Sequence, residues 1–295
     1  MPVASQNKCL SLAVHLHIYY VDMWEEIKEY LKNIGDYPYD LFVTMVEDNQ
    51  ELRDKITTFH KAAKIWVVEN RGYDIGPFID FLHHIDLDKY DLILKLHTKN
   101  KTAARGNGLS YHGLSLTRCQ WRDILYQGLL GTPQNFTHNL NCFQKEHIGM
   151  VGAPVLIEPK NKKSAEDSYK TVQRLLTEMG LPEYKNPPFV AGTMFICRAS
   201  LLQPLKKRLT LQDFPLSDQT FQKETFAHAV ERLFGAIIVA QGYKLASAKV
   251  DNRIMLKALI NTISHFLYQE KVTKHNHKLK KICKLPVYKK ELNSQ

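Results

Sequence analysis

The sequence lacks any apolar run close to the roughly 20 residues that a helix needs to cross a bilayer. Its first eight residues are polar and lead directly into a strand-like segment, so we expect no secretory leader. The five cysteines lie far apart, at positions 9, 119, 142, 197 and 283, and no spacing is typical of a metal or redox pair. These absences indicate free thiols in a reducing cytoplasm.

Several catalytic signatures are also missing. The chain has no GxxxxGK[ST] phosphate loop, no GxGxxG dinucleotide turn, no GxSxG nucleophile elbow and no HExxH zinc motif. Its 13 histidines are scattered, and neither His83-His84 nor the pair His275 and His277 makes a convincing metal site. The sequence therefore argues against the common nucleotide-hydrolysing, dehydrogenase, serine-hydrolase and zinc-protease chemistries.

The net charge of +10 is unevenly distributed along the chain. Residues 271–295 hold eight lysines and one acid, a net charge of +7, which leaves only +3 for the first 270 residues. A nearly neutral body does not favour a general nucleic-acid-binding surface. The basic tail suits an anionic membrane surface, at about 1 kcal/mol per lysine near the headgroups, and it equally suits a solvated, frayed terminus.

Strand-like and helix-like segments alternate over the first hundred residues. We expect strands at 12–20, 40–46, 65–68 and 90–96, and helices at 22–33, 49–63 and 77–85. Such alternation predicts right-handed crossovers and a doubly wound, mostly parallel α/β sheet with flanking helices. The expected main domain covers residues 1–252, with a nucleotide-binding half at 10–100 and a second half at 110–252.

The second half is less regular. We expect a polar loop at 99–113, helices at 116–130, 134–147, 169–179 and within 217–241, and strands at 149–157, 189–197 and 243–250. From residue 253, apolar residues recur at helical spacing, at positions 256, 259, 260, 263, 266 and 267. Residues 253–295 are therefore predicted to form an amphipathic, basic, helical C-terminal extension.

The turn after the third expected strand is the most informative segment. The strand at 65–68 runs into a polar turn that carries Asn70, Arg71 and Asp74. Ligands of open α/β sheets bind beyond the carboxyl ends of the strands, and an arginine with an aspartate could hold a phosphate and a sugar hydroxyl there. An ordinary connection with an Arg71–Asp74 surface salt bridge explains the same pattern.

The fourth expected strand ends in Lys95, His97 and Lys99, which alternation places on one face. A basic cluster at the carboxyl end of a strand suits a pyrophosphate, because lysine acts as a point charge on phosphate oxygens. A strand that leaves the core with solvated lysines is the alternative.

Two later segments carry further candidates. Gly192 and Thr193 interrupt an apolar strand, which marks either a close backbone approach or a simple bulge. His228, Glu231 and Arg232 are spaced to share one face of a helix, where Glu231 could act as a general base. A surface cluster of the same three side chains is the alternative.

Four segments, in this order, resemble the rhamnan-synthesis F family of bacterial polysaccharide glycosyltransferases. They are residues 69–78 (ENRGYDIGPF), 94–99 (LKLHTK), 191–195 (AGTMF) and 228–235 (HAVERLFG), within a similarity that spans about residues 10–250. The resemblance implies a GT-A-like fold and an enzyme that builds cell-wall, capsular or O-antigen polysaccharide from a nucleotide sugar. It makes residues 110–252 the acceptor half, and it does not cover the basic tail.

The chain departs from the GT-A pattern at one position. Such enzymes carry an Asp-x-Asp metal motif at a strand end, and here Lys95, His97 and Lys99 take its place. We therefore expect metal-independent or weakly metal-dependent transfer, because lysines can neutralise a diphosphate leaving group without a cation. No metal ligand is assigned, and the expected donor is dTDP-rhamnose or a UDP-sugar.

The resemblance implies an inverting reaction with a role for each candidate. The donor would be positioned by Asn70, Arg71 and Asp74, and the charge on the leaving diphosphate would be offset by Lys95, His97 and Lys99. The acceptor hydroxyl would be deprotonated by Glu231, which lies beside His228 and Arg232 in the sequence. Room for the acceptor would be left by Gly192 and Thr193. The acceptor would be lipid-linked or a growing polysaccharide. The enzyme would lie at the inner face of the bacterial cytoplasmic membrane, held there by the basic tail.

Two other functions stay open at this point. One is a non-catalytic glycan-binding or scaffolding module that keeps the fold without turning over a nucleotide sugar. The other is a membrane-surface or nucleic-acid binder in which the tail provides the affinity.

Overall fold

The computed structural model describes residues 9–99, 105–111, 114–153, 155–157, 163–217, 226–272, 277–282 and 285–291. The chain divides into two units, one of residues 1–100 and 125–249 and the other of residues 101–124 and 250–295. The candidate site residues all belong to the first unit.

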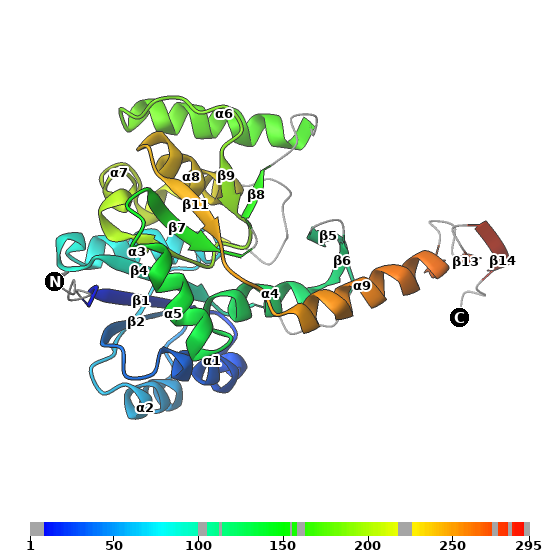
Figure 1. The fold of residues 1–295 in the computed structure, drawn as a ribbon, viewed down its shortest axis with the longest axis horizontal. Coiled ribbons are helices and arrows are strands. Elements are labelled where there is room, and N and C mark those ends of the chain that lie inside the picture. Colours follow the sequence, from blue (N-terminus) through cyan, green and yellow to red (C-terminus); the bar gives the residue numbers. More distant parts are fainter. Residues whose placement is uncertain are drawn as a thin grey trace, which may run out of the picture. The chain divides into compact units, whose positions relative to one another are not determined.

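The first unit is built on a seven-stranded sheet with flanking helices (Figure 1). The strands lie in the order β11 (Lys244–Ser247), β7 (Ile148–Gly152), β10 (Phe195–Arg198), β4 (Leu92–His97), β1 (Leu12–Ile18), β2 (Tyr39–Met45) and β3 (Lys64–Val67). Neighbours pair in parallel except β10, which is antiparallel to both β4 and β7. The predicted α/β sheet is confirmed as a mixed sheet in which one central strand runs against the others.

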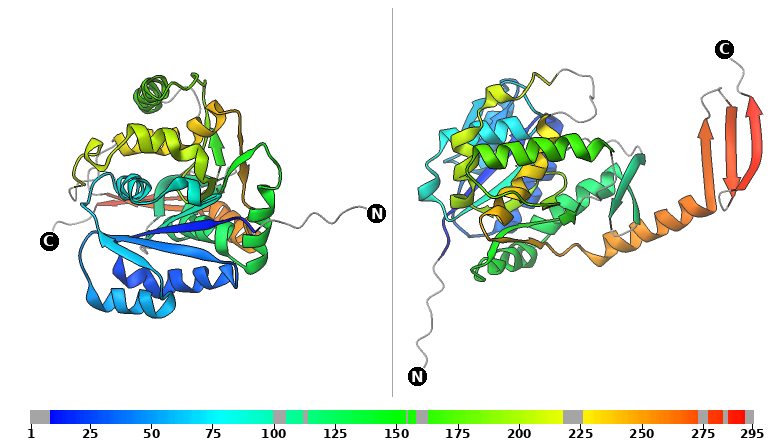
Figure 2. Two further views of the ribbon diagram at one scale, coloured as in Figure 1. Left: turned by 90° about the vertical axis from the view of Figure 1, so that its left-hand side faces the viewer. Right: turned by 90° about the horizontal axis from the view of Figure 1, so that it is seen from above.

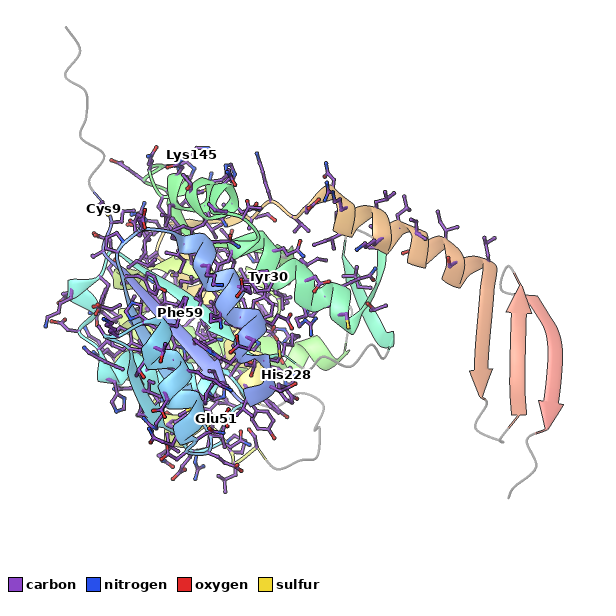
Figure 3. All side chains as sticks on the ribbon, turned by 90° about the horizontal axis from the view of Figure 1, so that it is seen from below. Cys9, Tyr30, Glu51, Phe59, Lys145 and His228 are labelled. Carbon is purple, nitrogen blue, oxygen red and sulfur yellow. The ribbon has the colours of Figure 1, made fainter. Side chains whose placement is uncertain are left out.

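Helices cover both faces of this sheet. One face carries α3 (Ile75–His84), α6 (Lys163–Glu178), α7 (Gln203–Arg208) and α8 (Phe226–Ala240), which share an apolar core with Phe42 and Ile93. On the opposite face lie α1 (Trp24–Leu31) and α2 (Gln50–Phe59), drawn in blue (Figure 2). Tyr30, Phe59 and the exposed Glu51 of α2 lie on that side of the unit (Figure 3).

Before residue 250 the described part of the chain has two further α-helices and five short 3-10 helices. They are α4 (Arg118–Leu130), α5 (Pro133–Cys142) and five single turns of 3-10 helix, η1 (Val21–Met23), η2 (Lys32–Ile34), η3 (Leu87–Lys89), η4 (Ala199–Leu202) and η5 (Leu211–Asp213). Capping side chains start two of the helices. Asn49 accepts from the backbone of Leu52 at the start of α2, and Thr132 accepts from Asn135 at the start of α5.

Side-chain alternation places a row of polar residues on the α3 side of the sheet. The parallel register sets His15 beside Lys95 and His17 beside His97. Every residue of β1 and β4 is buried, including these four. Polar side chains inside a sheet need partners, because an unpaired buried polar group is destabilising. The row contains Lys95 and His97, two of the candidate site residues, and its buried side chains need polar partners from the segments around it.

Two predicted strands are each divided in the structure. The segment at 189–197 forms β9 (Pro188–Val190) and β10, separated by a turn at Gly192 and Thr193. The segment at 149–157 forms β7 and β8 (Val155–Ile157), and β8 pairs with β9 in a separate small sheet. Hydrophobicity runs through both breaks, so the sequence pattern alone predicts one strand in each place.

Several other boundaries differ from the expectation. The predicted loop at 99–113 contains β5 (Arg105–Tyr111), which pairs with β6 (Leu114–Thr117); the rest of that loop, at 100–104 and 112–113, lies outside the described residues. Helix α6 starts at Lys163, before the predicted residue 169. The expected helical pattern at 217–241 is α8, and its first part, at 218–225, lies outside the described residues.

In the second unit, α9 (Asn252–Leu267) runs alongside β6. Three antiparallel strands follow, β12 (Tyr268–Val272), β13 (His277–Ile282) and β14 (Leu285–Glu291). The predicted extension is therefore helical only as far as Leu267. Among the residues that the structure describes, no helix is both long and apolar enough to cross a membrane.

Candidate active site

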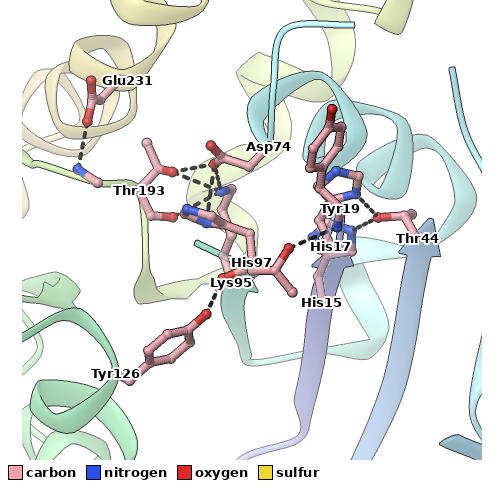
Figure 4. Close-up of polar contacts among 12 residues, drawn as sticks. His15, His17, Tyr19, Thr44, Asp74, Lys95, His97, Tyr126, Thr193 and Glu231 are labelled. Carbon is pink, nitrogen blue, oxygen red and sulfur yellow. Dashed lines mark hydrogen bonds and ion pairs between the residues drawn. The ribbon is translucent and has the colours of Figure 1, made fainter. Parts of the chain in front are cut away.

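Lys95 lies at the centre of the candidate site, and its side chain is fully buried. Its ammonium donates hydrogen bonds to Asp74 Oδ2 at 2.6 Å and to the carbonyl and hydroxyl oxygens of Thr193 at 3.0 and 3.1 Å (Figure 4). Burial lowers the pKa of Lys95, and the Asp74 carboxylate opposes that fall. Lysine has three donors, and all three are used here, so Lys95 joins β4 to the start of α3 and to the turn after β9.

Asp74 is the residue that precedes α3, and its side chain is 20% exposed. Besides Lys95, its Oδ2 accepts from the Thr193 hydroxyl and lies 3.4 Å from His97 Nδ1. Burial would raise the pKa of Asp74, but His97 and Lys95, with the hydrogen bonds from Lys95 and Thr193, outweigh burial and hold that pKa well below its usual range. Asp74 is therefore an anion at neutral pH, with part of its surface open to a ligand.

The backbone is strained on both sides of the Asp74–Lys95 pair. Tyr73 and Thr193 have φ angles of 57° and 54°, and each follows a glycine with positive φ. A Cβ on Gly72 would lie 2.4 Å from the Phe214 ring, so only glycine fits there. Non-glycine residues in the left-handed region are uncommon and cluster at functional sites. The Asp74–Lys95 ion pair lies between the two turns and contacts both of them.

Glu231 of α8 contacts the Gly192–Thr193 turn on the side opposite Asp74. Its Oε1 accepts the Gly192 N–H at 2.7 Å, and the side chain is half-buried (Figure 4). Burial raises the pKa of Glu231 above its ordinary value, and the hydrogen bond from Gly192 and the charge of Arg232 limit the rise. Asp74 and Glu231 therefore bind two successive residues of one turn, and Glu231 is the more basic carboxylate.

His228 and Arg232 flank Glu231 on α8. The His228 ring meets the Tyr73 ring edge to face at 6.1 Å. The Arg232 guanidinium donates to the His228 carbonyl at 2.7 Å and lies 5.5 Å from the Phe189 ring. The predicted shared face of the helix is thus turned towards the two strained turns.

Asn70 and Arg71 attach the first turn to a distant segment. Asn70 Nδ2 donates to the Ser217 carbonyl at 3.1 Å, and Arg71 Nη1 donates to the Phe214 carbonyl at 2.9 Å. The sequence also allows an Arg71–Asp74 salt bridge, but in the structure Arg71 pairs with Glu69 and Asp74 pairs with Lys95. The donor-binding role of Asn70 and Arg71 stays a prediction, and their contacts hold the turn in place.

His97 and Lys99 follow Lys95 along β4 and beyond its end. His97 is buried and its Nδ1 has no hydrogen-bond partner among the described residues, although it faces Asp74. Burial lowers the pKa of His97 well below its usual value, and the charges of Lys95 and Lys99 add to that effect. Lys99 is half-buried, so it keeps surface for a ligand.

Two histidines and a threonine next to this cluster had no predicted role. Thr44 Oγ1 lies 3.0 Å from both His15 Nε2 and His17 Nδ1. Burial lowers the pKa of His15 well below its usual value and that of His17 to about 4, so both rings are neutral at pH 7. The detectable signal was two histidines alternating within an otherwise apolar strand. Their partner, Thr44, gives no signal in the sequence.

The carboxyl ends of β1 and β4 are fastened together beside this row. The Thr98 hydroxyl accepts from the backbone N–H groups of Tyr19 and Tyr20 at 2.9 and 3.0 Å, and Tyr126 donates to the His97 carbonyl. No group of three or more His, Cys, Asp or Glu side chains among the described residues is arranged to hold a metal ion. The site is a polar rim with one partly exposed carboxylate, Asp74 or Glu231, on each side of the Gly192–Thr193 turn.

Comparison with known proteins gives distant relatives. Two strains of Xanthomonas campestris pv. campestris each have an uncharacterized protein WxcX that is 28% identical over 253 residues, which covers 84% of this chain and 34% of the relative. The chain thus spans about a third of the length of the curated relatives it matches.

Solved structures are similar only at low identity. A mannosyltransferase PcManGT from Pyrobaculum calidifontis, in complex with GDP-Man and Mn²⁺, is 12% identical, with a TM-score of 0.40 over 80% of this chain and 54% of that one. S. aureus TarS in complex with UDP-GlcNAc is 11% identical, with a TM-score of 0.38 over 83% of this chain and 61% of that one. Scores below 0.5 are too low to assign a donor or a metal to this chain.

A family model gives the firmest match. Residues 3–243 match the model described as rhamnan synthesis protein F, which covers most of the chain and all four of the motifs found in the sequence. The chain therefore belongs to the rhamnan synthesis protein F family, as those motifs predict.

Proposed function

We propose that this chain is a glycosyltransferase that moves a sugar from a nucleoside-diphosphate donor to a bacterial polysaccharide acceptor. One observation carries the proposal: the Gly192–Thr193 turn is bound by Asp74 on one side and by Glu231, at 2.7 Å, on the other. Sugar transfer needs an anchored donor and a base for the attacking hydroxyl. Two carboxylates with opposite pKa shifts, fixed to one turn, suit those two tasks.

Asp74 is the proposed donor anchor. Every hydrogen bond of this carboxylate to the described residues uses Oδ2, and the side chain is 20% exposed, so Oδ1 can accept from a hydroxyl of the donor sugar or ribose. Asp74 neutralises Lys95, and the buried ammonium therefore acts mainly by orienting Asp74. Asn70 and Arg71 assist by keeping the preceding turn in place.

The leaving diphosphate is proposed to lie beyond the end of β4. Lys99 is half-buried there, next to His97, and it provides the charge that Lys95 has already committed to Asp74. This arrangement supports metal-independent or weakly metal-dependent transfer, because a lysine offsets phosphate charge without a bound cation. The finer assignment of the donor, dTDP-rhamnose before a UDP-sugar, is part of the same proposal and is favoured by the family description.

Glu231 is the proposed general base of an inverting reaction. Its raised pKa makes it a better proton acceptor near neutral pH than an ordinary carboxylate. Oε1 is held by Gly192, which leaves Oε2 for the acceptor hydroxyl, and His228 and Arg232 border the same space. The hydroxyl then attacks the anomeric carbon on the face opposite the diphosphate, beside Gly192 and Thr193.

The proposed acceptor is a lipid-linked or growing cell-surface polysaccharide at the inner face of the cytoplasmic membrane. The eight lysines of residues 271–295 favour an anionic membrane surface over a neutral one. Because the match covers only 34% of each relative, assembly of a complete polymer is proposed for the longer protein rather than for this chain alone.

The test is a donor screen with the purified chain. We incubate it with dTDP-rhamnose, UDP-sugars and GDP-mannose and a lipid-linked acceptor analogue, and the product linkage is read by NMR. The proposal predicts one preferred donor, inversion at the anomeric carbon and release of the nucleoside diphosphate. Binding of glycan without turnover of any donor would contradict it and support the glycan-binding module.

A further inference from the structure

Helix α9 presents an apolar stripe on the face opposite the one by which it packs. Ile254 and Ala258 are buried, at 6% and 0% exposure, where α9 runs alongside β6. At 3.6 residues per turn, the exposed apolar residues on the opposite side of the helix fall within an arc of about 100° around the helix axis. It carries five large apolar side chains that are each 42–58% exposed: Leu256, Leu259, Ile260, Ile263 and Leu267.

Such a stripe is unusual within this chain. Among the described residues, ten large hydrophobic side chains are exposed, and five of them lie on this one helix, drawn in orange in Figure 2. Single exposed apolar residues are ordinary on protein surfaces, whereas a contiguous patch marks an interaction site. The stripe therefore needs a partner that offers apolar surface.

The charge that follows α9 identifies the chemistry of this partner. Residues 271–295 carry a net charge of +7, and Arg253 and Lys257 are exposed on α9 itself. A second copy of the chain would bring two such tails together, and their like charges would repel. An anionic lipid surface attracts the lysines and also supplies apolar acyl chains for the stripe.

We propose that α9 lies in the plane of an anionic membrane and inserts this stripe at the boundary between headgroups and acyl chains. The helix has 16 residues, fewer than the roughly 20 that span a bilayer, so it binds along the surface. This inference deepens the membrane association included in the proposed function and does not depend on catalysis. It assigns the apolar part of the affinity to α9 and the electrostatic part to the basic tail.

The test compares three proteins in vesicle flotation. They are the wild-type chain, a stripe variant with Leu259→Ser, Ile260→Ser and Ile263→Ser together, and a control with Tyr184→Ser, which removes an apolar side chain of 42% exposure elsewhere. The vesicles contain phosphatidylcholine either alone or with about 30% phosphatidylglycerol. Melting temperatures of all three proteins verify that they fold.

We expect the wild type and the control to bind the anionic vesicles. The stripe variant should bind them about 1,000-fold more weakly, at roughly tenfold for each of the three side chains removed. High salt should weaken wild-type binding only in part, because burial of apolar surface is not screened, and it should abolish the residual binding of the variant. A second variant, Ile263→Trp, should show a blue shift in fluorescence on addition of anionic vesicles, and Tyr184→Trp should not.

Equal vesicle binding by the stripe variant and the wild type would overturn the inference. So would a wild type that is a dimer in light scattering, does not bind vesicles and becomes monomeric in the stripe variant, because the stripe would then bind a second copy. Transfer to a soluble acceptor should be the same in all three proteins. If no protein transfers sugar but the wild type binds lipid through α9, the proposed function fails and this inference stands.

Discussion

Replacing Lys95 by methionine should destabilise the first unit strongly. Methionine keeps most of the aliphatic stem but removes the ammonium and its three hydrogen bonds. Breaking a buried ion pair costs about 3–5 kcal/mol when the partner is left charged. Asp74 keeps 20% exposure and the hydrogen bond from Thr193, so we place the loss at about 3–4 kcal/mol, in the lower part of this range.

The size of this effect can be assigned to the pair by a double-mutant cycle. Asp74→Asn alone leaves the buried Lys95 without its counter-charge and should also be strongly destabilising. The double variant, Lys95→Met with Asp74→Asn, buries no unpaired charge, so its loss should be smaller than the sum of the single losses by at least about 2 kcal/mol. Lys32→Met is the control, because its pair with Glu29 is exposed and should matter by less than about 1 kcal/mol.

The assay is urea unfolding followed by the fluorescence of Trp24 and Trp66, both of which lie in the first unit. The quantity compared is the free energy of unfolding extrapolated to water, with an unchanged slope against urea. A loss below about 1 kcal/mol for Lys95→Met, or additive losses in the double variant, would refute the view that this ion pair holds the two strained turns.

Four further outcomes follow from the site. Because the pKa of Glu231 is raised, kcat/KM should fall as the pH drops through a value above the ordinary glutamate pKa of about 4.3; a flat acid limb down to pH 4 would contradict this. The pKa of Asp74 is lower in the folded state than in the unfolded state, where it is about 3.9. The stability that Asp74 contributes is therefore present above the unfolded pKa and is lost as the pH falls towards the folded pKa. Asp74→Asn should remove this dependence and flatten the acid side of a stability–pH curve measured by urea unfolding. Gly72→Ala should lower the free energy of unfolding by more than about 1 kcal/mol, since φ is 63° and the new Cβ meets the Phe214 ring, and an unchanged urea midpoint would contradict it. EDTA should leave most of the transfer activity intact, and a complete loss that Mn²⁺ or Mg²⁺ restores would contradict the metal-independent proposal.

The parts of the fold that depend on local pattern could be predicted from the sequence. The alternating strands and helices of the first hundred residues predict β1 to β4 and α1 to α3, because each element buries one of its faces. The antiparallel direction of β10 could not be predicted, because strand pairing is settled by contacts between distant segments. Gly192 and Thr193 were recognised as an interruption of an apolar strand, but a bulge could not be told from a complete break because apolar residues lie on both sides. The division between β7 and β8 was missed for the same reason.

Within the candidate site, residue types were easier to predict than partners. Asp74, Lys95 and Glu231 stood out as charged groups at strand ends and on an apolar helix. Their connection through Thr193 and Gly192 could not be predicted from the sequence, because Asp74 and Thr193 are 119 residues apart and Gly192 and Glu231 are 39 residues apart. The sequence also suggested that Lys95 faces a ligand, whereas the structure turns its ammonium towards Asp74.

The central claim is that Asp74 anchors the donor and Glu231 activates the acceptor. The most direct measurement is to compare donor Kd by calorimetry and kcat for two variants, Asp74→Asn and Glu231→Gln, with the donor found in the screen. We expect Glu231→Gln to keep the wild-type Kd while kcat falls by about 10² to 10⁴, and Asp74→Asn to weaken the Kd itself. A fully active Glu231→Gln enzyme, or an unchanged donor Kd in a folded Asp74→Asn protein, would contradict it.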